Sequence, residues 1–150
     1  MSRNQIIWGG NYFADYLPPS KGFICWDKRC DARLTNNFAD CEYAWLSEGL
    51  GVARVFRYMW SGMLQGDMAN KEQRIHPTQK PIRLYTWLLK NYAKPGDKIL
   101  DTHVGSASSL IACERLRYMY VGFEIDEEYY KMACERLEVE RDQLMWSLLP

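Results

Sequence analysis

Two carboxylates and a loop of small residues have the types and spacing to bind a nucleoside cofactor. Asp101 ends a short apolar run, and Gly105 follows it within the segment VGSAS. A helical pattern and a second apolar run, Met119–Phe123, come next. Glu124 then follows about 20 residues after the loop, where a carboxylate can accept hydrogen bonds from ribose hydroxyls. The pattern predicts strand, loop, helix and strand, with a nucleoside site where the two strands end.

The same motif also fits an ordinary strand–helix–strand connection. The strict dinucleotide pattern has three glycines, whereas this loop has one, with Ala107 where a second could stand. Asp101 could simply cap the following loop, and Glu124 could be a solvated carboxylate beside Asp126. No Gly-Lys-Ser/Thr follows the loop, which excludes a phosphate-binding P-loop.

Flanking motifs narrow the interpretation. His76–Pro81 reads HPTQKP and precedes a predicted helix, and Gly122–Ala133 reads GFEIDEEYYKMA. In this combination the chain resembles the amino-group DNA methyltransferases, which modify N6 of adenine or N4 of cytosine, in their permuted motif order. Asn4–Trp26, NQIIWGGNYFADYLPPSKGFICW, is similar to the middle of a phage-type adenine methyltransferase. The resemblance covers nearly the whole chain.

The resemblance implies an α/β, Rossmann-like methyltransferase fold, truncated at the N-terminus, and S-adenosylmethionine as cofactor. Asp101 and the loop would lie near the methionine end of the cofactor, and Glu124 near its ribose. His103 could stack beside the ligand or pack within the loop, and Thr78 could also cap the helix that follows. Ala107, where the family has glycine, is expected to crowd the ligand. The implied cofactor-binding residues are His76, Pro77, Thr78, Asp101, His103, Gly105, Ser106 and Glu124.

The target-recognition segment of the family would fall between the two sets of motifs. Arginine can bind phosphate or read guanine, and aromatic rings can stack on an unpaired base. A solvated strand face over core aromatics fits equally well. The residues concerned are Arg54, Arg57, Tyr58, Trp60, Lys71 and Arg74.

A D/N/S-P-P-Y/F/W motif, which holds the amine of a flipped base in these enzymes, does not occur in the sequence. Leu17–Ser20, LPPS, lacks both the polar acceptor and the ring. The resemblance places the motif upstream of Met1, with a strand between those predicted at Gln5–Trp8 and Lys98–Asp101. We therefore expect site-specific methylation of double-stranded DNA, with adenine N6 favoured, once a complementing chain supplies the motif. The alternative is a non-catalytic remnant that binds cofactor or DNA, and a homodimer is expected to cover the gap.

Composition excludes several other classes. The formal net charge is zero, which argues against a strongly basic, sequence-blind DNA binder. The five cysteines form no C-x-x-C pair, so neither zinc nor a disulfide framework is expected. His76 and His103 lack a convincing third metal ligand. No apolar run approaches the ~20 residues of a membrane span, and a cytoplasmic protein with free thiols is expected.

Chain length predicts one domain over 1–150, and the resemblance divides it into strands downstream of the missing motif (1–51), a recognition-like segment (52–75) and a cofactor-binding part (76–150). Alternation of strands and helices in the second half favours a mostly parallel, doubly wound sheet. Predicted strands cover 5–8, 23–26, 40–46, 52–60, 98–101 and 119–123, and predicted helical segments cover 12–16, 79–92, 110–116 and the residues after Asp126. We expect an exposed loop at 27–33, irregular chain at 62–74, Pro81 in the first turn of its helix, an inner face of Tyr130, Ala133 and Leu137 on the last helix, and fraying from Arg141.

Overall fold

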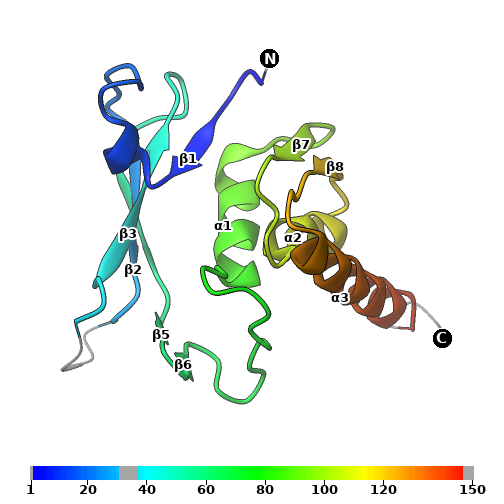
Figure 1. Ribbon diagram of the computed structural model, residues 1–150. Helices are drawn as coiled ribbons and strands as arrows, with labels where there is room; N and C mark the ends of the chain where they lie inside the picture. The colour runs from blue at the N-terminus through cyan, green and yellow to red at the C-terminus, as the bar shows by residue number, and fades with distance from the viewer. Residues whose placement is uncertain (1, 31–36, 147–150) are drawn as a thin grey trace. The chain divides into compact units, whose positions relative to one another are not determined.

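The computed structural model describes residues 2–30 and 37–146 of the chain. Contacts within the chain divide it into two compact units, residues 1–71 and 72–150, which Figure 1 draws together. Each unit is described by itself. The boundary lies inside the predicted recognition-like segment 52–75, and the single domain stays a prediction.

The first unit is built on a four-stranded sheet. Its strands are β1 (Ile6–Trp8), β2 (Phe23–Asp27), β3 (Cys41–Leu46) and β4 (Arg54–Arg57), in the order β1-β3-β2-β4. β3 is antiparallel to both of its neighbours, and only β2 and β4 run parallel. The prediction of a mostly parallel sheet is wrong for this unit. Between β1 and β3 the described residues contain the 3-10 helix η1 (Gly10–Phe13) and β2, but no crossover α-helix that would bring neighbouring strands parallel.

Alternation along the central strands builds the core of this unit. Ile24 and Trp26 on β2 are fully buried, as are Ala44 and Leu46 on β3, because alternate residues point to one face. The Trp26 indole N–H donates to the carbonyl of Tyr58 at 3.1 Å. The strands predicted at 5–8, 23–26 and 40–46 are confirmed, whereas residues 31–36 of the predicted loop region lie outside the described residues.

A short hairpin occupies part of the segment predicted to be irregular. β5 (Trp60–Ser61) pairs antiparallel with β6 (Leu64–Gln65). The two residues between them include Gly62 at φ +55°, a conformation that two-residue hairpin turns require. Strands of two residues have no readable period, so the sequence could not predict them.

The second unit contains the predicted strand, loop, helix and strand. β7 (Lys98–Asp101) runs parallel to β8 (Met119–Gly122), and α2 (Ser108–Leu116) is the crossover between them. α1 (Ile82–Tyr92) and α3 (Glu127–Trp146) complete the unit (Figure 1). The core cluster joins residues of all three helices: Ile82, Leu89, Ala107, Leu110, Ile111, Ala112, Cys113, Ala133 and Leu137.

The start of α1 differs from prediction because a residue distant in the sequence accepts its first N–H. Pro81 precedes α1 as its N-cap residue, and the first helical N–H, that of Ile82, donates to Glu72 Oε1 at 2.9 Å and not to Thr78. Asp126 caps α3 as predicted, accepting from the N–H groups of Glu128 and Tyr129.

The inner face and the end of α3 also differ from prediction. Tyr130 is 54% exposed, whereas Ala133 and Leu137 are buried as expected. α3 continues to Trp146, so the predicted fraying from Arg141 is wrong up to that residue; residues 147–150 lie outside the described part. Within that part, no helix is both long and apolar enough to cross a membrane. Nor do the described residues bring three His, Cys, Asp or Glu side chains together as metal ligands.

Candidate functional site

Parallel pairing brings the ends of β7 and β8 to one edge. Asp101 is the last residue of β7, and its partner in the register is Gly122. Beyond the strands, the N–H of Phe123 donates to the Asp101 carbonyl at 2.9 Å, and the N–H of Val104 donates to the Phe123 carbonyl at 3.0 Å. The loop after β7 therefore lies along the end of β8, as the sequence predicts for a nucleoside site.

Glu124 ties this loop to the strand end. Its Oε2 accepts the N–H of Gly105 at 2.7 Å, and its Oε1 accepts the N–H of Asp126 at 3.0 Å. The Asp126 N–H is the largest cause of the lowered pKa of Glu124. Burial opposes it, and the N–H groups of Gly105 and Ile125 and the nearby His76 lower the pKa further. The carboxylate is therefore anionic at neutral pH, and each oxygen keeps a lone pair for a further donor.

Asp101 shapes the loop itself. Its Oδ1 accepts the N–H of His103 at 2.9 Å, and its Oδ2 accepts the hydroxyl of Ser109. This is the capping role that the sequence left open for Asp101. The His103 ring is fixed in turn, with Nδ1 2.9 Å from Thr102 Oγ1.

A pocket of about 390 Å³ opens beside this strand end. Phe123 is 59% exposed and Ile125 fully exposed, one on each side of Glu124. Both residues line the same pocket as Glu124, and two apolar residues on either side of it in the chain are a signal in the sequence that could have identified them. The lining residues are Thr102, His103, Phe123, Glu124 and Ile125, of which only His103 and Glu124 were predicted.

The HPTQKP segment begins beside the same loop. A Cβ added to Gly105, which has φ +53°, would lie 3.5 Å from the ring of His76. That ring packs edge-on against Tyr129, with centroids 4.3 Å apart, and its Nδ1 accepts the N–H of Thr78 at 3.2 Å. Pro77 and Thr78 are exposed. The structure thus brings His76 beside Gly105 and near Glu124.

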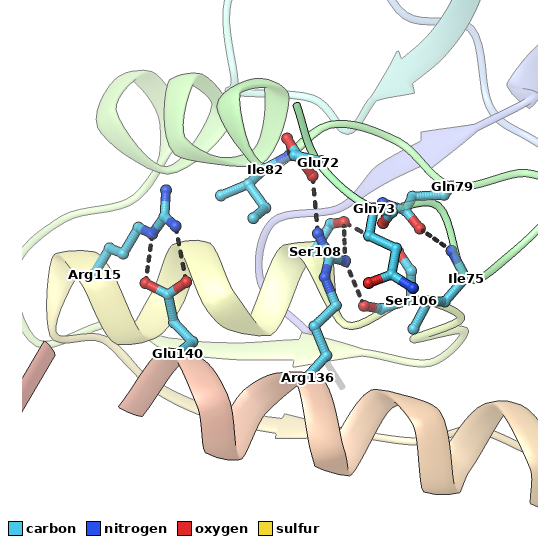
Figure 2. A network of polar contacts seen from close by, with 10 residues as sticks. All are labelled: Glu72, Gln73, Ile75, Gln79, Ile82, Ser106, Ser108, Arg115, Arg136 and Glu140. Carbon is cyan, nitrogen blue, oxygen red and sulfur yellow. Dashed lines mark hydrogen bonds and ion pairs between the residues drawn. The ribbon is translucent and has the colours of Figure 1, made fainter. Parts of the chain in front are cut away.

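Gln79 holds the HPTQKP segment in shape. Its side chain is buried; Oε1 accepts the N–H of Ile75 at 2.9 Å, and Nε2 donates to the carbonyl of Gln73 at 3.1 Å (Figure 2). The glutamine of the motif therefore acts on its own segment in this structure.

Two residues of the loop face inward. Ser106 is 4% exposed, and its hydroxyl lies 3.0 Å from that of Ser108. Ala107 is fully buried in the core cluster at φ +61°. Its methyl group is not among the residues that line the pocket, which argues against the expectation that it crowds a ligand there.

The predicted recognition residues do not form one surface within either unit. Arg54 and Arg57 are three positions apart on β4, so they point to opposite faces, and Arg57 Nε lies 3.4 Å from Asp27 Oδ2. Trp60 is buried, which argues against its stacking on a base. Tyr58 is half-buried, Lys71 ends the first unit and Arg74 belongs to the second.

Comparison with known proteins decides among families that could use such a site. A family model for N6 and N4 methyltransferases, described as DNA methylase, matches residues 3–135. The chain belongs to this family. Type II methyltransferase M2.DpnII of Streptococcus pneumoniae is 30% identical over 144 residues, 93% of this chain and 52% of that protein. Type II methyltransferase M.HpaI of Haemophilus parainfluenzae is 41% identical over 71 residues, 47% of this chain and 23% of that protein.

Solved structures support the same fold. The crystal structure of the M1.HpyAVI–SAM complex matches with a TM-score of 0.59 and 22% identity, covering 89% of this chain and 73% of that one. A second crystal structure of M1.HpyAVI matches with a TM-score of 0.58 and 24% identity. The expected methyltransferase fold is confirmed. The methylase chain spans about half, or less, of the length of the curated relatives it matches.

Proposed function

We propose that the β7–α2 loop and Glu124 bind S-adenosylmethionine, and that the chain serves in methyl transfer to double-stranded DNA, with adenine N6 as the target. The hydrogen bond from Gly105 N–H to the anionic Glu124 carries the proposal, because it places a charged acceptor in a pocket with apolar side chains on both sides. Family membership and the names of the type II methyltransferase relatives support the reaction class.

The residues present fit this cofactor. A pocket of about 390 Å³ suits a nucleoside-sized ligand. The free lone pairs of Glu124 can accept from both ribose hydroxyls, while Phe123 and Ile125 offer apolar surface to the sugar and base. Asp101 keeps the loop in place through the His103 N–H and the Ser109 hydroxyl.

The other end of the cofactor would lie toward the HPTQKP segment. His76 lies beside Gly105, and the exposed Pro77 and Thr78 follow it. Because the Ser106 hydroxyl points inward, this residue would contact the cofactor only through its backbone. When bound, the cofactor supplies an electrophilic methyl group, and these residues of the chain orient it.

Methyl transfer also needs an acceptor for the exocyclic amine of the flipped base. No D-P-P-Y motif occurs in these 150 residues, so we assign this acceptor to a segment outside them, in a complementing chain or elsewhere in a longer polypeptide. The same observation favours the second candidate, a non-catalytic protein that binds cofactor or DNA. The predicted homodimer stays a prediction.

Calorimetry with S-adenosylhomocysteine tests the cofactor site. Wild-type protein should bind, and Glu124→Ala should weaken binding by about 1–3 kcal/mol, the usual loss for a hydrogen bond to a charged group. Glu127→Ala is the control, since it removes an equal charge three residues from Glu124. The Glu127 side chain is 80% exposed and pairs with Lys131. Absence of binding at millimolar ligand would overturn the cofactor assignment.

Transfer of tritium from labelled cofactor to mixed-sequence duplex separates the two functions. The purified chain alone should stay at background, and addition of a polypeptide carrying the D-P-P-Y strand should start labelling. Labelling by the chain alone would mean that a residue within it replaces the motif. Cofactor binding without labelling in either case would favour the non-catalytic protein.

A further inference from the structure

One guanidinium joins three segments of the second unit behind the candidate site. Arg136, on α3, donates from Nη1 to the Ser106 carbonyl at 2.6 Å and to Ser108 Oγ at 2.9 Å. Its Nη2 donates to Glu72 Oε2 at 2.8 Å. Both charged side chains are only 16% exposed (Figure 2). None of the sequence motifs includes either residue.

This arginine and Glu124 hold the same turn by its two ends. Glu124 accepts the N–H of Gly105, and Arg136 donates to the carbonyl of the next residue, Ser106. Gly105, in this turn, has φ +53°, and Ala107, directly after it, has φ +61°, which is sparsely populated for alanine. A backbone in that conformation persists when its surroundings determine it, and these two contacts supply such a constraint.

The glutamate extends the constraint to the HPTQKP segment. Glu72 uses its second oxygen, Oε1, to accept the first N–H of α1, that of Ile82. Gln79 fixes the intervening chain through Gln73 and Ile75, and His76 lies beside Gly105. Glu72 therefore links Arg136, which holds the loop, to the start of α1, directly after the HPTQKP segment.

The same unit contains a second arginine–glutamate pair for comparison. Arg115 on α2 and Glu140 on α3 form two parallel hydrogen bonds of 2.7 and 2.8 Å, visible beside the first pair in Figure 2. This pair joins the two helices, and within the described residues its hydrogen bonds do not reach the loop. Glu140 lies one helical turn beyond Arg136 on α3, so the two pairs are neighbours, although the Arg115 side chain is 45% exposed and that of Arg136 is 16% exposed.

We propose that Arg136 and Glu72 are positioning residues for the cofactor loop: they fix the Gly105–Ser106 turn and the HPTQKP segment in the geometry that binds the ligand. Arg115 and Glu140 only stabilise the packing of α2 on α3. The proposal rests on the proposed function for its ligand, but its structural part concerns the loop alone. A loop ordered before binding does not lose that conformational freedom when the ligand arrives, which increases affinity.

Two measurements on Arg136→Met and Arg115→Met test this. Amide hydrogen exchange of residues 104–109 should be about tenfold faster in Arg136→Met than in the wild type, and affinity for S-adenosylhomocysteine should fall about tenfold. Arg115→Met should leave the exchange rate and the affinity within about twofold of wild type, even if it lowers the thermal midpoint as much as Arg136→Met does. Equal effects of the two substitutions on loop exchange or on affinity would overturn the proposal.

Milder variants keep the test decisive if Arg136→Met does not fold. Glu72→Gln keeps an oxygen for the Ile82 N–H but removes the charge that Arg136 pairs with, and Arg136→Lys cannot reach both Glu72 and Ser106 with a fork of donors. Both variants should exchange the loop amides faster than wild type while keeping a thermal midpoint near that of Arg115→Met. Unchanged exchange in both variants would overturn the proposal. If the wild type binds no ligand, the proposed function fails, while the exchange comparison still decides whether Arg136 orders the loop.

Discussion

Asp27 and Glu124 both follow an apolar strand, and backbone N–H groups lower the pKa of each. Asp27 Oδ1 accepts from Arg29 and Cys30, both at 3.0 Å and both in its own turn, and the Cys30 N–H is the largest cause of its lowered pKa. Glu124 accepts one N–H from its own turn and another from Gly105, 19 residues away. A carboxylate whose backbone donors all lie in its own turn closes that turn, whereas one that receives a backbone N–H from a distant loop shapes the space between two strand ends.

The largest expected difference is in ligand-induced stabilisation. A ligand that binds only the folded state raises the melting temperature by an amount that grows with the logarithm of the ratio of ligand concentration to Kd. Saturating S-adenosylhomocysteine should raise the Tm of wild type and of Asp27→Ala alike, and that of Glu124→Ala much less, as expected from a loss of about 1–3 kcal/mol in binding. Differential scanning fluorimetry with and without ligand checks this. An equal ligand-induced shift in all three proteins would contradict the distinction between the two carboxylates.

In the absence of ligand, Asp27→Ala should lower the free energy of unfolding more than Glu124→Ala does. Asp27 holds two N–H groups of its turn and pairs with Arg57 at 3.4 Å, and its side chain is 28% exposed. Asp27→Ala should therefore destabilise the first unit by about 0.5–2 kcal/mol, as loss of a helix cap does. Urea unfolding followed by tryptophan fluorescence measures this, with Asp15→Ala, at an exposed acid outside the turn, as the control. A loss no larger than that of the control would mean that Asp27 does not hold the turn.

Acid should weaken both regions, with the loop of Glu124 affected at the higher pH. A carboxylate whose folded pKa is lowered adds stability that is present above its unfolded pKa, near 4.5 for Glu124 and 3.8 for Asp27, and lost as pH falls through the folded value. Stability should fall below pH 4.5. Glu124→Gln should flatten the first part of that fall, measured as urea midpoints from pH 6 to pH 3. A parallel pH dependence in wild type and variant would contradict a lowered pKa at Glu124.

The comparison also explains what the sequence could predict. Glu124 and Asp101 were found because apolar runs and a glycine loop are local patterns, and parallel pairing follows from one crossover helix. Arg136 and Glu72 are 64 residues apart, and no spacing links them. Thr78 has good capping chemistry, yet the first N–H of α1 donates to Glu72, a carboxylate that also pairs with Arg136. Tertiary partners of this kind decide between locally equivalent choices, and only the folded chain reveals them.

The smallest expected effect concerns Ala107, which lies in the loop that Glu124 holds. Ala107→Gly removes the cost of a left-handed alanine, about 1–2 kcal/mol, but also removes a buried methyl and makes the unfolded chain more flexible, each worth about 0.4–1 kcal/mol. The net change in stability should therefore lie within about 1 kcal/mol. Affinity for S-adenosylhomocysteine should change by less than about twofold, because the methyl is fully buried in the core cluster and the pocket is lined by other residues. Calorimetry on the variant beside wild type measures this, and a tenfold gain in affinity would show that the methyl group obstructs the ligand after all.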